Sequence, residues 1–227
     1  MEKLQFRTLR ADEIDCRVGS CNDKGCSLLM YKDARVDMRL LDEVVGPMNW
    51  KRSHELINGN LFCTVSIRDE KGNWVSKQDV GTESNTEKEK GQASDAFKRA
   101  CFNWGIGREL YSCPFVWVNL SSDEWRTGYN GRKQPKTHFY VSNIEYDDNR
   151  NVSFLRIVDE TGRERYVYGK SAEADKKREE LIKRLKEAKD RTELESIYKT
   201  ADAALRKDKQ VLDVCTDKAV EFNNAAA

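Results

Sequence analysis

The sequence predicts an α+β fold in which three consecutive antiparallel strands are covered by helices and followed by a helical tail. Strand-like stretches at residues 50–57, 61–68 and 74–80 are joined by short turns. Amphipathic helical patterns flank these stretches on both sides, and such helices must lay their apolar faces on a sheet to form a core. From about residue 171 the chain becomes rich in Lys and Glu at helical spacing.

Length and composition bound the possible functions. Because a domain typically has ~150 residues, the 227 residues suffice for one substantial core and an appendage. The 40 Lys and Arg residues balance the 39 Asp and Glu residues, so a global basic field is absent and nucleic-acid binding is neither indicated nor excluded. No apolar run approaches the ~20 residues that span a bilayer, and the first residues lack the apolar stretch of a signal peptide. We therefore expect a cytoplasmic protein without membrane contact, whose seven Cys residues are reduced.

The first elements are a short strand and a helix. An apolar run at residues 28–31 predicts the strand, after a Gly-containing segment that begins at residue 14. Asp33 is a candidate helix cap, because its carboxylate can accept hydrogen bonds from the first turn. Apolar residues then recur at helical spacing as far as Val45, and Gly46-Pro47 ends the helix.

Turn residues connect the three central strands. Asn58-Gly59 joins the first two strands and predicts a tight hairpin, because both residues tolerate positive φ. Residues 71–73, Lys-Gly-Asn, join the second strand to the third. The first half of the chain therefore has the predicted order helix, three strands, helix.

The helix after the third strand carries a basic flank. Thr86 and Glu89 predict its start as a capping box, and its apolar face ends near Gly105. Lys98 and Arg99 are adjacent on the flank, and residues 88–108 contain five basic residues against two acidic ones. Paired cations on a rigid helix can neutralise successive phosphates without reading bases. From composition alone, however, a solvated helix face is the preferred interpretation.

The second half contains a basic segment, further strands and the tail. Residues 126–138 hold four basic residues and no acid, which predicts a mobile basic loop with Tyr129 as a candidate for base stacking. Strand patterns return over residues 137–169, either as a second sheet or as an extension of the first. Three apolar stripes at helical spacing follow, and Thr192 and Glu195 form a second capping-box pattern.

No compact catalytic or metal-binding motif is evident. Gly169-Lys170-Ser171 is similar to the end of a phosphate-binding loop, but Glu164 stands where that motif needs a second Gly. Cys16, Cys21 and Cys26 could form a zinc site with a His, although structural zinc usually uses ligands two to four residues apart. Isolated thiols are the preferred interpretation. We therefore expect no cofactor and no enzymatic activity.

A longer stretch, residues 17–111, resembles the annealing domain of the Rad fifty-two family of single-strand annealing proteins, particularly the short versions of phages and prophages. No single matching piece is very specific, and their order along the chain carries the resemblance. The pieces are YKDARVDMRLLDEVVG, Gly46-x-x-x-Trp50, the hairpin, Asp79-Val80-Gly81, and the run from Asp95-Ala-Phe-Lys-Arg-Ala100 to Phe102-Asn-Trp-Gly105.

This resemblance implies a β-β-β-α core that assembles into rings or open filaments, with single-stranded DNA in a groove around the outside. It implies that Lys98 and Arg99 grip the DNA backbone at the groove floor. Arg17 and Tyr31 similarly match residues that line the groove, and Lys90 matches a basic position earlier on the helix. All five are therefore candidate DNA-binding residues.

Two departures from the family pattern and one addition complete the candidate site. Phe102 stands where eukaryotic members carry a further Arg, which removes a phosphate contact. The segment between Gly81 and Lys88 is shorter, which affects any secondary DNA site. Arg108, from the same basic stretch, is added to the candidate DNA-binding residues.

The predicted function is ATP-independent annealing of complementary DNA strands in phage-type homologous recombination and double-strand break repair, in the cytoplasm of a bacterial host. An annealing and oligomerising domain is predicted over residues 1–170. A helical tail over residues 171–227 could recruit a host single-strand-binding protein. The alternatives are a protein that coats single-stranded DNA or RNA without annealing it, and a small metal-dependent nuclease using His54 and His138.

Overall fold

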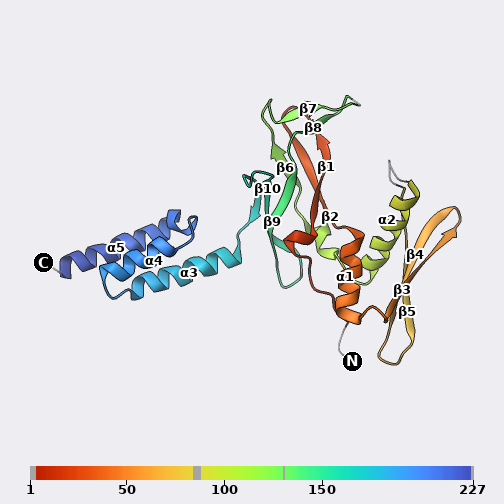
Figure 1. Ribbon diagram of the computed structural model, residues 1–227, viewed down its shortest axis with the longest axis horizontal. Coiled ribbons are helices and arrows are strands. Elements are labelled where there is room, and N and C mark those ends of the chain that lie inside the picture. The colour runs from red at the N-terminus through yellow and green to blue at the C-terminus, as the bar shows by residue number, and fades with distance from the viewer. Residues whose placement is uncertain (1–3, 84–87, 130, 226–227) are drawn as a thin grey trace. The chain divides into compact units, whose positions relative to one another are not determined.

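A computed structural model describes residues 4–83, 88–129 and 131–225. The chain divides into two compact units, one that ends at Gly169 and one that begins at Lys170 (Figure 1). The first unit holds the described strands and helices α1 and α2, and the second holds α3, α4 and α5. The predicted α+β class with a helical C-terminal region is confirmed. Among the described residues, no helix has the length and apolarity that crossing a membrane requires.

An antiparallel hairpin stands near the start of the first unit, where only a short strand at residues 28–31 was expected. Strand β1 (Asp15–Cys21) pairs with β2 (Gly25–Tyr31). The turn is closed by Asn22, whose side-chain oxygen accepts from the backbone N–H of Lys24 at 2.8 Å. The expectation missed β1 because its sequence, DCRVGSC, lacks the alternation of apolar and polar residues that marks a half-buried strand.

Helix α1 (Ala34–Val45) begins and ends where the sequence predicts. The side chain of Asp33 caps it by accepting a hydrogen bond from the backbone N–H of Arg35. Gly46 ends it with a φ of 83°, a conformation that residues with a Cβ rarely adopt. The predicted cap and stop are both confirmed.

The three central strands form a sheet of their own in the order β3-β4-β5, with antiparallel neighbours. Asn58 and Gly59 have φ values of 51° and 77°, which is the left-handed geometry of a two-residue hairpin turn. The predicted hairpin is therefore confirmed. The strands are β3 (Trp50–Ile57), β4 (Asn60–Arg68) and β5 (Trp74–Val80).

Helix α2 (Lys88–Asn103) packs against β4 and β5. Phe97 and Cys101 on its inner face are completely buried, as the apolar stripe predicts. Thr86 of the predicted capping box lies outside the described residues. The buried face of α2 fixes the direction of its opposite, basic flank.

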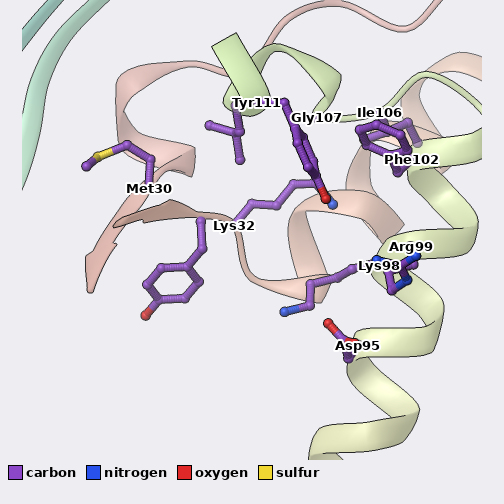
Figure 2. Close-up of a pocket in the computed structure, with 11 residues that line it drawn as sticks. Met30, Lys32, Asp95, Lys98, Arg99, Phe102, Ile106, Gly107 and Tyr111 are labelled. Atoms are coloured by element: carbon purple, nitrogen blue, oxygen red, sulfur yellow. The ribbon is translucent and has the colours of Figure 1, made fainter. Parts of the chain in front are cut away.

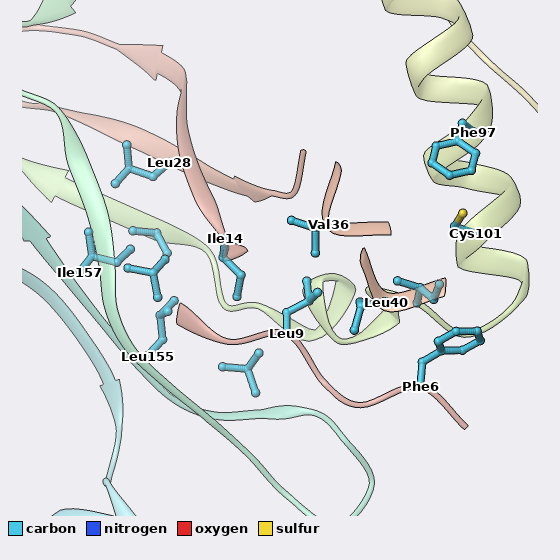
Figure 3. Close-up of a cluster of buried hydrophobic side chains, with 14 of the residues drawn as sticks. Phe6, Leu9, Ile14, Leu28, Val36, Leu40, Phe97, Cys101, Leu155 and Ile157 are labelled. Carbon is cyan, nitrogen blue, oxygen red and sulfur yellow. The ribbon is translucent and has the colours of Figure 1, made fainter. Parts of the chain in front are cut away.

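One continuous hydrophobic core runs through the first unit and joins α1, α2, the three-stranded sheet and a second, six-stranded sheet. Figure 3 shows the part of this core around α1, α2 and the six-stranded sheet. Full burial of such a side chain contributes about 1.5–3 kcal/mol, so the core holds together elements that are far apart in the chain. Its most shielded members include Phe6, Leu9, Leu40, Leu41, Val65, Phe97, Ile106, Val116, Leu155 and Ile157.

The second large sheet has six strands in the order β11-β10-β9-β1-β2-β6. The N-terminal hairpin lies inside it, because Asp15 of β1 pairs with Tyr140 of β9. The strand patterns after residue 137 therefore belong to a separate sheet that they share with the N-terminal hairpin. Its remaining strands are β6 (Val116–Asn119), β9 (Phe139–Tyr146), β10 (Val152–Asp159) and β11 (Glu164–Gly169).

The basic segment at residues 126–138 contains regular structure, so the expected loop was wrong. Strands β7 (Trp125–Thr127) and β8 (Lys133–Pro135) form a two-stranded antiparallel hairpin. Strands of three residues are too short to show alternation. The Gly residues and the Pro within the segment also favour a loop interpretation.

The second unit consists of three helices with a small core of their own. They are α3 (Ala172–Glu187), α4 (Arg191–Thr200) and α5 (Lys209–Ala225), with a short 3-10 helix between the last two. The buried residues of this core are Leu181, Leu185, Ala188, Leu194 and Val211.

The predicted capping box of Thr192 and Glu195 was wrong, because helix α4 starts before Thr192. Its cap is Asp190, whose side chain accepts from the backbone N–H of Glu193 at 2.8 Å. The Glu193 carboxylate accepts in turn from the backbone N–H of Lys189 at 2.9 Å. Two overlapping cap patterns are present in this stretch, and the acidic one determines the helix start.

Candidate nucleic-acid interface

A cleft of about 270 Å³ lies where the end of β2 meets the basic flank of α2 and the 3-10 helix η2 (Arg108–Ser112) (Figure 2). It brings Tyr31 together with Lys98 and Arg99, which come from distant parts of the sequence. Three of the six sequence-predicted site residues therefore line one cleft. The other lining residues are Met30, Lys32, Asp95, Phe102, Ile106, Gly107, Leu110 and Tyr111.

Lys98 reaches from α2 into the cleft (Figure 2). No salt bridge joins it to another residue in the described part of the chain, although its charge helps to lower the pKa of Asp33 and opposes the rise in the pKa of Asp37. Asp95, one turn earlier, is engaged elsewhere, because its carboxylate accepts from the backbone N–H and the hydroxyl of Thr82 at 3.0 and 3.1 Å. The Lys98 ammonium is therefore available to an anionic ligand.

Arg99 is exposed and already has a partner. Its Nη2 lies 3.2 Å from Oδ1 of Asp79 at the end of β5, and Asn103 donates to the other carboxylate oxygen at 3.3 Å. Exposed ion pairs contribute roughly 0–1 kcal/mol, so a phosphate can compete for the guanidinium. Asp79 orients Arg99 at the edge of the cleft and lowers the net charge there.

The floor of the cleft contains a buried ion pair that the sequence did not reveal. The Nζ of Lys32 lies 2.5 Å from Oδ1 of Asp37, and both side chains are buried. Burial raises the pKa of Asp37 to about 6, although the Lys32 cation opposes this change. Because the two charges compensate each other, Lys32 shapes the floor more than it attracts anions. The sequence clue to this pair was a lone acid within the buried stripe of α1.

Gly107 is required by the path of Lys32. It has a φ of 75°, and a Cβ added there would lie 2.3 Å from Cε of Lys32. No side chain of any size can therefore replace it without moving the buried lysine. Gly107 is in this way a structural determinant of the cleft.

An aromatic pair forms another part of the lining. The rings of Phe102 and Tyr111 are 4.8 Å apart between centroids and tilted by 58°, and Tyr111 is 77% exposed. A neighbouring hollow of about 390 Å³ shares both rings and Arg99 with the first. Exposed rings beside cations can stack unpaired bases. Tyr111 is thus a candidate ligand-contacting residue that sequence reasoning missed, because its partner Phe102 was considered only as a lost Arg.

Arg17 does not line the cleft, but it lies near it. Its side chain is exposed on β1, where Arg17 pairs with Leu29 of β2. The next pair on the same face, Asp15 and Tyr31, reaches the cleft. Arg17 therefore extends the candidate surface away from the cleft along the sheet.

Arg108 and Lys90 also lie outside the cleft lining. Arg108 donates to the backbone carbonyl oxygens of Phe102 and Asn103 at 2.8 and 2.9 Å, so it satisfies the C-terminal end of α2. Lys90 is exposed in the first turns of α2, about 12 Å along the helix from Lys98. Neither is brought to the cleft by this structure.

The residues of the zinc and nuclease alternatives do not assemble into a site. Within the described ranges, no three or more His, Cys, Asp or Glu residues are grouped so that they could hold a metal ion. The His54 ring nitrogen lies 3.1 Å from the carbonyl oxygen of Ala93. Burial raises the pKa of the Cys16 and Cys26 thiols to about 12, so both are protonated thiols near neutral pH in the metal-free protein.

Comparison with known families identifies the family of this chain. The model of the Rad52/22 family double-strand break repair protein matches residues 1–127, more than half of the chain. The chain belongs to the Rad52/22 family. The matched residues include the whole cleft, from Met30 to Tyr111. The resemblance stated from the sequence is therefore confirmed.

Two similar proteins are named single-stranded DNA-binding protein DdrA. The protein from Deinococcus radiodurans is 36% identical over 107 residues, which cover 44% of this chain and 48% of the relative. The protein from Deinococcus deserti is 38% identical over 97 residues, which cover 40% of this chain and 45% of the relative. The chain spans about half the length of the curated relatives that it matches.

Proposed function

We propose that this Rad52/22-family protein binds single-stranded DNA in the cleft and anneals complementary strands without ATP, as a step of homologous recombination and double-strand break repair. The observation that carries the proposal is the convergence of Tyr31, Lys98 and Arg99 beside the ring pair of Phe102 and Tyr111. The name of the two relatives, single-stranded DNA-binding protein, supports single-stranded DNA as the ligand class. A phage-type recombination system in a bacterial cytoplasm is the proposed setting.

Each part of the cleft has a physical role in this proposal. Lys98 and Arg99 neutralise phosphates, which gives affinity that is independent of sequence and sensitive to salt. The aromatic rings stack bases through faces that all bases share. The base edges then remain free to pair with a second strand.

Base pairing itself supplies the driving force for annealing. Stacking contributes about 1.4 kcal/mol per base-pair step, so about ten matched steps outweigh the loss of a few phosphate contacts. The protein has only to arrange the strand and then release the duplex. No nucleotide hydrolysis is needed for such a reaction, and the protein is proposed to be non-enzymatic.

Assembly would extend the cleft into a track. A single chain carries a formal charge of only +1, and a ring or filament of copies repeats the same local cations along one surface. We propose that residues 1–170 bind DNA and oligomerise, and that the helical unit from residue 171 recruits a host single-strand-binding protein. A protein that coats single strands without annealing them is the second candidate function, and the name of the relatives favours it equally.

Annealing is tested by mixing complementary fluorescent oligonucleotides with the protein, in the absence of ATP and metal. Faster pairing than the spontaneous rate is the expected result. Tight binding with an unchanged pairing rate would support the coating protein, and cleavage that EDTA abolishes would support a nuclease. In a binding titration over a series of salt concentrations, the double variant Lys98→Ala/Arg99→Ala should bind single strands more weakly, with a salt slope lower by about 1.4, or ~0.7 for each lost phosphate contact.

A charge-matched variant distinguishes the loss of the cleft cations from a general loss of positive charge. Lys176→Ala/Lys186→Ala removes two exposed cations from α3 and should leave the slope unchanged. An unaltered slope in the Lys98→Ala/Arg99→Ala variant would remove the cleft from the binding site.

A further inference from the structure

The hairpin of β7 and β8 carries several basic residues, none of which lines the cleft. Its basic residues are Arg126, Arg132, Lys133 and Lys136, and residues 126–138 include no acid. Just before the hairpin, Glu124 is held by Arg165 at 2.8 Å, so this carboxylate does not depend on the hairpin for a cation. Asp123 accepts a hydrogen bond from the Ser121 hydroxyl at 2.6 Å, and Lys136 is close enough to help lower the pKa of this carboxyl.

Local contacts give this hairpin a defined structure. The Lys133 ammonium lies 4.0 Å from the centroid of the Trp125 ring, and the backbone N–H of Lys136 donates to the Glu124 carbonyl at 2.9 Å. The backbone N–H of Gly128 donates to the Arg132 carbonyl at 2.8 Å. These contacts matter because an isolated two-stranded hairpin is marginally stable at best in water.

Tyr129 projects from the connection between the two strands with its side chain completely exposed. A bare aromatic ring of this kind gains nothing for folding, because no apolar area is buried. An aromatic ring among cations is the combination that binds single strands, in which cations hold phosphates and the ring stacks a base. Duplex bases are already stacked and offer no such face.

The position of the hairpin connects it to the cleft. Strand β8 contacts β1, and Lys133 is close enough to Cys21 to oppose the rise in the pKa of that thiol that burial causes. Asp15, at the other end of β1, pairs with Tyr31 of the cleft. The strand spans six residue-to-residue steps between these two ends, a distance of about 20 Å, and Arg17 lies exposed between them.

From this arrangement we infer that the β7–β8 hairpin is a second contact for single-stranded DNA, reached by a strand that leaves the cleft and passes Arg17. This inference rests on the proposed function and extends its site. Phosphates lie ~3.4 Å apart along one strand of a helix, so the 20 Å between cleft and hairpin correspond to about six nucleotides. Arg126, Arg132 and Lys136 bind phosphates, and Tyr129 stacks a base.

Oligonucleotide length separates the two contacts in the test. Fluorescence anisotropy measures the affinity of the full-length protein for oligothymidylates of about 6 and about 18 nucleotides, over a series of salt concentrations. The wild type should bind the longer strand more tightly and with a steeper salt slope. In the variant Arg126→Ala/Arg132→Ala/Lys136→Ala, the slope for the longer strand should fall by about 2, while the short strand is bound as before.

Two matched variants test whether the aromatic ring of Tyr129 stacks a base. Tyr129→Ala should weaken binding of the longer strand about five-fold or more, and Tyr129→Phe should bind it like the wild type, because stacking does not need the hydroxyl. The variant Lys176→Ala/Lys186→Ala/Lys209→Ala, with the same loss of charge in the helical unit, should keep the full length dependence. Circular dichroism confirms that each variant is folded.

The outcomes distinguish the two proposals. If the hairpin variants keep the length dependence of the wild type, the inference is overturned while binding of the short strand still supports the cleft. If the wild type binds neither oligonucleotide, the proposed function fails and the inference fails with it. The inference is also overturned if the hairpin variants bind duplex DNA more weakly but still bind the longer single strand more tightly than the short one, as the wild type does.

Discussion

At the scale of single residues, the buried pair of Lys32 and Asp37 controls the shape of the cleft. Its atoms are 2.5 Å apart and almost inaccessible to water. Removing one partner of such a pair leaves a buried charge without compensation, which typically costs about 3–5 kcal/mol. The pair therefore fixes the geometry beneath Lys98 even though it adds little net charge.

The variant Lys32→Met should lose stability in a pH-dependent way. Folding raises the pKa of Asp37 from 3.8 to about 6, so in the wild type the contribution of this carboxyl to stability falls as pH rises from about 4 to about 6. Without Lys32 the pKa rises further, and the loss should be about 3–5 kcal/mol near pH 7.5 and smaller near pH 5. Urea unfolding of the wild type and the variant at the two pH values measures this loss in the free energy of unfolding.

Two further variants control this experiment. Lys32→Met/Asp37→Leu removes both charges and should regain much of the lost stability, because the buried carboxylate is gone. Lys71→Met changes an exposed lysine and should have little effect. An equal loss for Lys32→Met at both pH values would contradict the assignment of Asp37 as the stranded acid.

At the scale of elements, local capping chemistry sets where the helices begin. Asp33 caps α1 and Asp190 caps α4, each through a side-chain oxygen that accepts from a backbone N–H in the first turn. The first cap was predicted correctly because one candidate stood before the apolar stripe. The second was misplaced because Asp190 and Thr192 compete, and a carboxylate also interacts favourably with the helix dipole.

Substitutions at these two positions should have unequal effects. Asp190→Ala should destabilise the helical unit by about 1 kcal/mol, the usual contribution of a cap, whereas Thr192→Ala should change it little. Thermal unfolding followed by helical circular dichroism compares the two. A larger loss for Thr192→Ala would restore the capping box that the sequence alone suggested.

At the scale of the whole molecule, two separate cores hold two units. The core of the first unit joins both large sheets with α1 and α2, while the second unit buries a small set of residues of its own. Stability that arises from separate cores need not be shared between them. The DNA-binding proposal concerns the first unit alone.

The variant Leu185→Ala should destabilise the second unit without destabilising the first. Leu185 is completely buried in the second core, so its truncation should cost about 2–5 kcal/mol there. Hydrogen exchange should accelerate in α3, α4 and α5 and remain slow in β4, and affinity for a short single strand should stay unchanged. Lys186→Ala, at the exposed neighbouring position, is the control. Faster exchange in β4 would show that the units unfold together.

The sequence by itself determined the features that depend on neighbours in the chain. The Asn58-Gly59 turn, the Asp33 cap and the buried face of α2 follow from backbone preference and side-chain periodicity. It also pointed to Lys98 and Arg99 as candidate site residues, because both lie beside the buried face of an amphipathic helix. The order of such local patterns was enough to indicate the family.

Only the tertiary structure decided which residues share a site. The strand β1 has no apolar alternation and forms because β2 and β9 supply partners on both sides. The meeting of Tyr31 with Lys98, the buried Lys32 floor and the aromatic pair at Tyr111 arise when the core brings β2, α2 and η2 together. Contacts across such sequence distances leave no periodic trace in the chain, because they depend on how whole elements pack.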